Sequence, residues 1–275
     1  MSILLPEPHE TGSPGSPQER RQGLSPSVRV LVLILAWGAL TCVLIEVGVL
    51  VVHSSSVNAF DRHVTSLVVA HRSPALNQVM KAVTWFGSWV TLGVVAILLV
   101  VLAVRRRLPV AAVVLAVVAW AGEYGGVTLA KHVVERGRPP QDVRLVTAHG
   151  SSWPSGHTAI ALIVFTVFAL LVAVMTPRAG NRALAWVFAA LAVAAVGFSR
   201  VELGVHWTTD VIASMVFVSA WLMVLFALFA SDARPKHIAD AQYNDESRHG
   251  RMPRSRTPRT ESMEAKPGSA CGEEE

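Results

Sequence analysis

The sequence from residue 157 to residue 176, HTAIALIVFTVFALLVAVMT, contains no Asp, Glu, Lys or Arg at any of its 20 positions. A helix needs about 20 mostly apolar residues to cross the hydrocarbon core of a bilayer. This stretch is therefore long enough and apolar enough to be a membrane-spanning helix.

Similar stretches lie on both sides of it, and they predict six spanning helices in all. Hydrophobic residues make up 52% of the 275 residues and charged residues only 16%, whereas a soluble domain carries roughly 25% charged residues. An ordinary soluble enzyme is therefore excluded. We expect an all-α polytopic membrane helix bundle formed by residues 27–230. The six predicted spans cover about 28–52, 84–104, 109–130, 157–176, 183–199 and 209–230.

The two ends of the chain have a different composition. Residues 1–26 are rich in Pro, Ser, Gly and Glu, and residues 231–275 alternate basic and acidic residues. Such segments lack the apolar surface needed to fold alone, so we expect disordered tails. The first apolar run begins too late and is too long for a signal peptide. The net charge of +5 does not indicate nucleic-acid binding, because the basic residues lie between apolar runs rather than in an aromatic-interleaved patch.

Residues 54–82 mix charged and apolar positions. They favour an amphipathic helix lying on the membrane surface, with a short re-entrant segment as the alternative. Tryptophans near the predicted span ends are expected to anchor at the membrane interface. They are Trp85, Trp89, Trp153 and Trp207.

The basic residues of the connecting segments predict the orientation. Arg20, Arg21 and Arg29 precede the first span, Arg105–Arg107 follow the second, and Arg178 and Arg182 separate the fourth and fifth. With six spans, all of these residues lie on one side, which the positive-inside rule assigns to the cytoplasm. Both termini are then cytoplasmic, and loops 54–82, 131–156 and 200–208 lie outside.

Three polar clusters occupy the predicted outer loops, and each lies at the end of a span. The first runs from Lys131 to Arg138-Pro139, the second is Pro154-Ser155-Gly156-His157, and the third comprises Ser199-Arg200, His206 and Asp210. Lys131, Arg138 and Arg200 are three cations suited to a phosphate group. Ser155 and Gly156 precede a predicted helix, whose N-terminal N–H groups also bind anions.

The histidines of these clusters indicate phosphoryl chemistry. His206 and Asp210 are expected on one face of the last helix, where the carboxylate would hold the Nδ1 proton and leave Nε2 free as a nucleophile or base. His157 comes from a different span. Two histidines at a phosphate site divide naturally into nucleophile and general acid.

Together the clusters resemble the three signature motifs of the type 2 phosphatidic acid phosphatase superfamily, K-x6-RP, PSGH and SR-x5-H-x3-D. Every motif position is present with the family's spacing. The resemblance implies that His206 is the nucleophile that forms a phosphohistidine, that Asp210 orients it, and that His157 protonates the leaving oxygen and then activates water. It also implies catalysis without a metal or other cofactor, and a set of phosphate-binding residues: Lys131, Arg138, Ser155, Gly156 and Arg200.

The expected function is hydrolysis of a lipid phosphate monoester or pyrophosphate, because the site lies at headgroup depth while the lipid tail stays in the bilayer. Phosphatidate, phosphatidylglycerophosphate, polyprenyl pyrophosphate and sphingoid phosphates are all candidates. One alternative is a phosphotransferase with a lipid or sugar acceptor. Another is a non-catalytic lipid-phosphate binding or transport protein, and a third is a channel or transporter with chance motifs. The sequence leaves a homo-oligomer open.

Some residues outside the motifs carry weaker expectations. Glu46 and Glu123 lie inside apolar spans, where ionisable groups are costly, and structural pairing within the bundle is one interpretation beside a substrate or proton-path role. Gly122 and Gly126 indicate close helix packing. Arg136 and Arg144 lie outside the pattern, and we expect them to snorkel towards the interface.

Overall fold

The computed structural model describes residues 24–229, and nearly all of both predicted disordered tails lies outside these residues. Within the described range the chain forms helices and no strand, which confirms the all-α prediction. In chain order the elements are α1 (Pro26–His53), α2 (Ser55–Ala70), α3 (Pro74–Val83), the 3₁₀ turn η1 (Thr84–Gly87), α4 (Trp89–Val104), α5 (Val110–Val134), the 3₁₀ turn η2 (Gln141–Val143), α6 (Gly156–Met175), α7 (Ala179–Glu202) and α8 (Thr208–Phe229).

Five helices in residues 24–229 are long and apolar enough to cross a membrane, namely α1, α5, α6, α7 and α8. A sixth span results if α3 with η1 and the following α4 count together, since they meet at a bend of 43°. The six-span prediction thus holds in this form, and the protein is a multi-pass membrane protein.

The second predicted span, 84–104, begins too early. Residues 84–87 form the 3₁₀ turn η1, and α4 starts at Trp89. Ser88 caps α4, because its hydroxyl accepts a hydrogen bond from the Thr91 N–H at 3.3 Å. Gly87 packs directly against the backbone oxygen of His157, where a side chain would clash. The helix therefore breaks at the point where it meets the start of α6.

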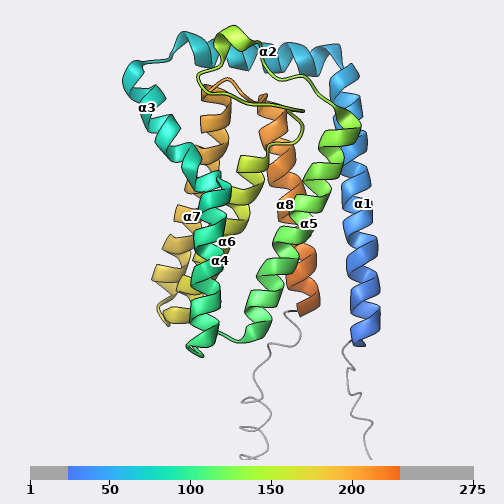
Figure 1. The fold of residues 1–275 in the computed structure, drawn as a ribbon, viewed down its shortest axis with the longest axis vertical. Helices are drawn as coiled ribbons and strands as arrows, with labels where there is room; N and C mark the ends of the chain where they lie inside the picture. The colour runs from blue at the N-terminus through green and yellow to red at the C-terminus, as the bar shows by residue number, and fades with distance from the viewer. Residues whose placement is uncertain (1–23, 230–275) are drawn as a thin grey trace, which may run out of the picture. The chain divides into compact units, whose positions relative to one another are not determined.

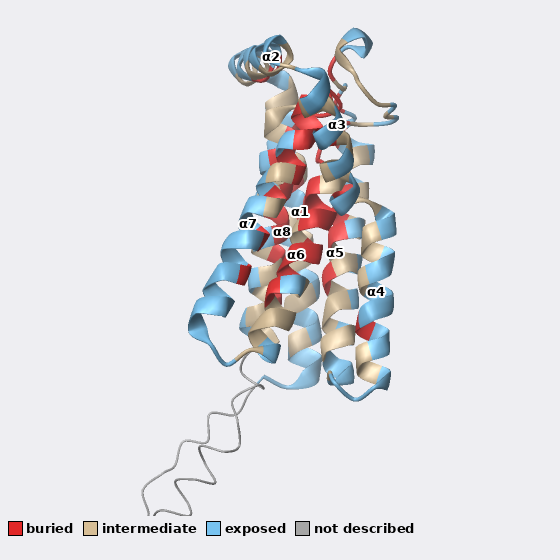
Figure 2. Ribbon diagram, turned by 90° about the vertical axis from the view of Figure 1, so that its left-hand side faces the viewer, coloured by how far each residue is buried: buried red, intermediate tan, exposed pale blue. Residues whose placement is uncertain are grey.

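Helix α6 occupies the middle of the bundle (Figure 1). It packs against α4, α5, α7 and α8, while α1 packs against α5 and α8. Buried residues follow the centre of the bundle along its length, and exposed residues face outward (Figure 2). A core cluster joins Leu44, Val127, Ile163 and Phe217 from four different helices.

Small residues allow α5 and α8 to approach closely. Gly122 lies against the ring of Trp221, and Gly126 against the ring of Phe217. A Cβ atom at either glycine would overlap these rings. The predicted close packing at Gly122 and Gly126 is confirmed.

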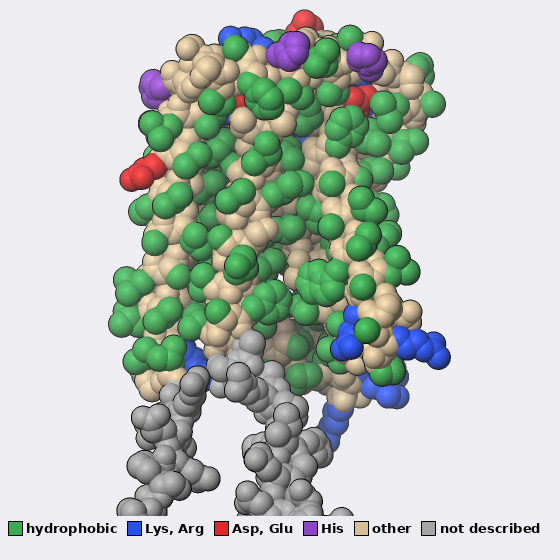
Figure 3. Space-filling view, turned by 180° about the vertical axis from the view of Figure 1, so that it is seen from behind, with side chains coloured by type: hydrophobic (Ala, Val, Ile, Leu, Met, Phe, Trp, Pro, Cys, Tyr) green, Lys and Arg blue, Asp and Glu red, His purple; other side chains and the backbone are tan. Residues whose placement is uncertain are grey.

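The outer surface of the bundle is apolar over most of its length, with Lys and Arg side chains at its lower end and His side chains, together with some Lys, Arg, Asp and Glu side chains, at its upper end (Figure 3). Glu46 is exposed on α1, so its predicted pairing inside the bundle is wrong. The reason is helical geometry, since Leu44 and Gly48 face the neighbouring helices and turn Glu46 outward.

Residues 54–82 form two helices where one surface helix was expected. Helix α2 lies across the end of the bundle, and α3 descends from it towards α4 (Figure 1). Ser73 caps α3 by accepting a hydrogen bond from the Leu76 N–H at 3.2 Å, and Pro74 occupies the first helical position. These start signals end the surface helix and begin the descending one.

Candidate active site

The three sequence clusters meet at the end of the bundle that α2 covers. A polar cavity of about 320 Å³ lies among the C-terminal turn of α5, the start of α6 and the end of α7. Six of the eight residues predicted to act on the phosphate line it, and Ser155 and Asp210 lie directly behind its wall. The six are Lys131, Arg138, Gly156, His157, Arg200 and His206.

His206 and Asp210 form a pair, although not on one helical face as expected. Helix α8 begins only at Thr208, so His206 precedes it. Asp210 stands in the first turn and accepts a hydrogen bond from the Trp207 N–H at 2.9 Å, which satisfies a helix-terminal donor. The same oxygen, Oδ2, lies 3.4 Å from His206 Nδ1. The pairing arises from this cap rather than from helical periodicity.

The contacts of His206 select its neutral tautomer. Its Nε2 lies 3.2 Å from Arg138 Nη1. A guanidinium can only donate, so Nε2 accepts and the ring proton resides on Nδ1, facing Asp210. Burial lowers the pKa of His206 to about 3 although Asp210 opposes the shift. The imidazole is therefore neutral at pH 7, and its Nε2 accepts a hydrogen bond from Arg138, which lines the polar cavity with it.

Arg138 organises the loops around the cavity. Its Nε donates to the Gly150 oxygen at 3.0 Å, Nη2 to the oxygens of His149 and Ser151, and Nη1 to the Val205 oxygen at 2.6 Å. The guanidinium thus joins the loop before α6 to the turn before α8. Burial lowers the pKa of Arg138 from its ordinary value.

Lys131 and Arg200 bring two further cations to the cavity. Lys131 lies in the last turn of α5, not in a loop as expected, and its Nζ donates to the oxygens of Ser151 at 3.0 Å and Pro154 at 2.7 Å. Arg200 lies in the last turn of α7 and donates from Nη1 to Thr84 Oγ1 at 2.6 Å. Its Nε is buried and has no hydrogen-bond partner among the described residues. Such an orphaned donor is suited to an incoming phosphoryl oxygen.

The start of α6 presents backbone N–H groups to the cavity. Ser155 is the N-cap residue, but its hydroxyl caps no N–H and instead accepts a hydrogen bond from Thr158 Oγ1 at 2.9 Å. No atom lies within 4 Å of a Cβ built on Gly156, so an anion has room to reach the backbone there. His157 follows on the first turn and lines the cavity.

Trp153 holds the loop before α6 in place. It is only 1% exposed, and its Nε1 donates to the Leu44 oxygen on α1 at 3.1 Å. The prediction that Trp153 is an interface anchor is therefore wrong. The ring packs against Gly48, which offers the space for it. Helix α1 carries no motif, yet it fixes the loop that supplies Ser155 and His157.

Arg136 and Glu123 also belong to this region, although the sequence predicted snorkelling for Arg136 and left pairing within the bundle and a substrate or proton-path role open for Glu123. Arg136 does not snorkel: it is 4% exposed and forms ion pairs with Asp61 at 2.7 Å and Asp210 at 2.6 Å. Asp61 lies on α2, far away in the sequence, so no local signal could reveal the pair. Glu123 lines the polar cavity, and its Oε2 has no hydrogen-bond partner within the described range. In residues 24–229 no three His, Cys, Asp or Glu residues form a group that could hold a metal ion.

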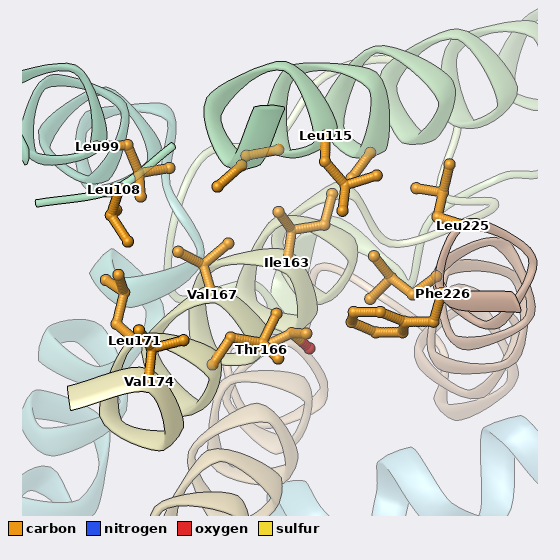
Figure 4. Close-up of a pocket in the computed structure, with 15 residues that line it drawn as sticks. Leu99, Leu108, Leu115, Ile163, Thr166, Val167, Leu171, Val174, Leu225 and Phe226 are labelled. Atoms are coloured by element: carbon orange, nitrogen blue, oxygen red, sulfur yellow. The ribbon is translucent and has the colours of Figure 1, made fainter. Parts of the chain in front are cut away.

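Two apolar cavities lie within the bundle, and one of them is adjacent to the polar cavity. One of about 300 Å³ lies between α4, α5 and α6, and Trp89 lines both this cavity and the polar one. Another, of about 130 Å³, lies deeper and is lined almost entirely by apolar side chains (Figure 4). No titratable group lines either cavity, so both are suited to a hydrocarbon chain and not to a catalytic step.

Comparisons with known proteins find similarity in sequence and in fold. The model of the PAP2 superfamily matches residues 110–236. Phosphatidylglycerophosphatase B of Bacillus subtilis (strain 168) is 29% identical over 191 residues, which cover 67% of this chain and 89% of the relative. A solved structure, the transmembrane PAP2 type phosphatidylglycerolphosphate phosphatase from Bacillus subtilis, has a TM-score of 0.58 and 25% identity, covering 75% of this chain and 95% of its own. The crystal structure of Aquifex aeolicus LpxE has a TM-score of 0.46 and 24% identity to this chain. The match covers 59% of this chain and 93% of the LpxE chain.

The predicted family is supported by the motifs, the family model and the fold. All motif positions lie within the matched residues 110–236, and six of the motif residues line one cavity. Over these residues the chain is similar to proteins of the PAP2 superfamily.

Proposed function

We propose that this protein hydrolyses a lipid phosphate monoester or pyrophosphate through a phosphohistidine formed on His206. Its assignment as a lipid phosphatase rests on the family match and on the relative named phosphatidylglycerophosphatase B. One observation carries the proposal furthest: the cavity that holds the cations and histidines shares Trp89 with the apolar cavity between α4 and α5. A phosphate headgroup and a hydrocarbon tail each find a matching environment, which favours a lipid over a sugar phosphate.

In the first step, His206 Nε2 attacks the phosphorus atom and the bond to the leaving oxygen breaks. His157, in its protonated form, transfers a proton to that oxygen. Asp210 holds the Nδ1 proton of His206 and stabilises the positive charge that the ring gains. Lys131, Arg138, Arg200, the Ser155 hydroxyl and the Gly156 N–H group bind the phosphoryl oxygens.

In the second step, neutral His157 takes a proton from water, whose oxygen attacks the phosphorus atom. The phosphorus–nitrogen bond breaks, inorganic phosphate leaves, and His206 returns to its neutral form. Each histidine ends the cycle as it began. The balance needs water and no other co-reactant.

The substrate we place first is phosphatidylglycerophosphate, because the relative and the solved structure carry that activity in their names. Phosphatidate, polyprenyl pyrophosphate and sphingoid phosphates have the same combination of phosphate and tail. We further propose that both termini are cytoplasmic and that the site opens on the outer face. The exposed basic turn Arg105–Arg107 at the opposite end of the bundle supports this orientation.

Phosphate release by the purified protein in detergent tests the proposal. The panel is phosphatidylglycerophosphate, phosphatidate, polyprenyl pyrophosphate and glucose 6-phosphate, with a chelator present and His206→Ala measured alongside. We expect release from lipids, retained with chelator and abolished in the variant. Activity of His206→Ala near that of the wild type would refute the nucleophile assignment. Loss of lipid phosphate without free phosphate would instead indicate transfer to an acceptor.

A further inference from the structure

Arg136 occupies a buried position beside the site but does not line the polar cavity. Helix α5 ends at Val134, and Glu135 adopts a left-handed conformation with φ of 48°. This turn redirects the chain, so that Arg138 faces the cavity while Arg136 points behind it towards Asp210. Two tryptophan rings flank the guanidinium, with centroids 6.0 Å away for Trp153 and 5.8 Å away for Trp207.

The guanidinium of Arg136 bridges two buried carboxylates. Its Nη1 donates to Asp210 Oδ1 at 2.6 Å and to Thr209 Oγ1 at 2.7 Å. Its Nη2 donates to Asp61 Oδ2 at 2.7 Å and to Asn58 Oδ1 at 3.2 Å. Asp61 and Asp210 are 1% and 0% exposed. Without Arg136, both buried carboxylates would lose their ion-pair partner.

The two oxygens of Asp210 have different partners. Oδ1 binds Arg136, whereas Oδ2 accepts the Trp207 N–H and faces His206 Nδ1. Because Arg136 holds Oδ1, the carboxylate cannot rotate Oδ2 away from His206 without breaking a charge-assisted hydrogen bond. Arg136 therefore determines how Asp210 is presented to the histidine.

Asp61 connects this network to α2. Its Oδ1 accepts the Thr209 N–H at 3.1 Å, and its Oδ2 accepts Thr209 Oγ1 at 2.5 Å as well as Arg136. A residue of α2 thus satisfies a free N–H at the start of α8. The helix that lies across the end of the bundle is attached to the same turn that carries Asp210.

We propose that Arg136 is a positioning residue for the reaction and that Asp61 of α2 holds it in place. Arg136 acts through Asp210, fixing the carboxylate that orients His206, and touches no substrate atom. The inference rests on the proposed function, because it assigns a purpose to the orientation of His206. It also explains why α2 contributes to the site although it contains no motif.

Enzyme kinetics of three variants tests this role. Arg136→Lys keeps the charge but replaces the planar fork by a single ammonium group, which cannot serve both carboxylates in the same geometry. Arg136→Gln removes the charge. Asp61→Asn keeps Arg136 and Asp210 and weakens only the contact between residue 61 and the Arg136 guanidinium. The matched control is Arg62→Gln, since Arg62 is the exposed neighbour of Asp61 on α2.

The measurements are kcat and KM for phosphatidate in mixed micelles, and inhibition by orthovanadate, a phosphate analogue. We expect kcat to fall about 10²-fold in Arg136→Gln, as for a misplaced catalytic group. The decrease in kcat should be smaller in Arg136→Lys and in Asp61→Asn. KM and the inhibition constant should stay near wild type, because Arg136 does not line the cavity. In the double variant Arg136→Lys with Asp61→Asn, the effects should be less than additive, because both residues act on Asp210.

Thermal unfolding separates these results from a loss of fold. If Arg136→Gln does not fold, Arg136→Lys and Asp61→Asn decide the question. Wild-type kcat in both folded variants would overturn the proposal. So would a raised KM with weaker vanadate inhibition, because Arg136 would then bind phosphate itself. An active His206→Ala, measured in parallel, would instead refute the proposed function on which the inference rests.

Discussion

At the scale of single residues, Asp210 shows how one carboxylate serves the fold and the chemistry together. It ends the backbone turn by accepting the Trp207 N–H, pairs with Arg136, and faces His206. Replacing it therefore affects both the tautomer of the histidine and the start of α8.

The first prediction concerns Asp210→Asn. An amide can present an N–H to His206 Nδ1, which would reverse the tautomer and remove the lone pair from Nε2. We expect kcat to fall roughly 10⁴-fold, the size seen when a His–carboxylate pair is changed this way in serine proteases. Steady-state kinetics on phosphatidylglycerophosphate measures the effect, and unchanged kcat would show that Asp210 does not select the tautomer.

The second prediction follows from the depressed pKa of His206. The folded state holds this imidazole at a pKa of about 3, whereas its ordinary value is 6.5. Between these values the unfolded chain binds a proton that the folded protein rejects, so stability falls as the pH falls from 6.5 towards 3. Thermal unfolding in detergent across this window should show a decrease in Tm. The decrease in Tm with falling pH should be smaller in His206→Asn than in the wild type. An equal dependence of Tm on pH in both proteins would contradict a depressed pKa of His206.

At the scale of elements, the break between η1 and α4 brings two spans into contact at the site. Gly87 lies against the backbone of His157 and the side chain of Val196, so α4 and its preceding turn rest on α6 and α7. Ser88 begins the new helix immediately afterwards. The bend therefore depends on a glycine contact as well as on a cap.

The third prediction compares two glycines near the start of α4. Gly87→Ala inserts a methyl group against backbone atoms, which cannot move as freely as a flexible side chain, and should destabilise the protein by about 1–3 kcal/mol. Gly93→Ala meets nothing within 4 Å and should be neutral or stabilising by up to about 1 kcal/mol.

Thermal unfolding of both variants measures the difference, and phosphatase activity checks whether displaced His157 lowers the rate in Gly87→Ala. Similar stability of the two proteins would show that the contact at Gly87 yields easily.

At the scale of the whole bundle, the described residues have a polar end and an apolar body. The motif residues gather under α2, and the exposed basic turn between α4 and α5 lies at the opposite end (Figures 1 and 3). An apolar cavity lined by α4, α5 and α6 shares Trp89 with the polar cavity, and a second apolar cavity shares lining residues with the first. This arrangement suits a substrate that is polar at one end only.

The fourth prediction tests whether the apolar cavity between α4, α5 and α6 binds the lipid tail. Ala116 lines the cavity between α4 and α5, and Ala116→Phe should fill part of it. We expect KM for long-chain phosphatidate to rise roughly tenfold, while hydrolysis of p-nitrophenyl phosphate stays unchanged. Val114→Phe, on the exposed face of the same helix, is the matched control. Equal effects on both substrates would place the tail elsewhere.

The fifth prediction tests the orientation of the bundle. In a variant with Cys42 and Cys271 replaced by Ser, a new cysteine is placed at either Gln141 or Arg106, both of which are exposed. A membrane-impermeant maleimide added to intact cells should label Gln141→Cys and not Arg106→Cys. The reverse pattern would put the site in the cytoplasm.

The amino-acid sequence by itself predicted the helical class, the approximate spans and six of the residues that line the polar cavity. These features depend on local composition and on spacing along the chain, such as twenty apolar residues in a row or a histidine before the last span. The start of α4 was missed because its break depends on contact between Gly87 and α6. Lys131 was assigned to a loop because the apolar run ends at Ala130, whereas α5 continues to Val134.

Only the tertiary structure decided the roles of residues whose partners are distant in the sequence. Trp153 reaches α1, Arg136 reaches Asp61 on α2, and Glu46 turns outward while Glu123 turns into the cavity. A buried charge is recognised by what lies around it, and those surroundings come from several helices at once. Periodicity along one segment carries no information about these long-range neighbours. The contacts that hold the site in place are therefore seen only in the tertiary structure.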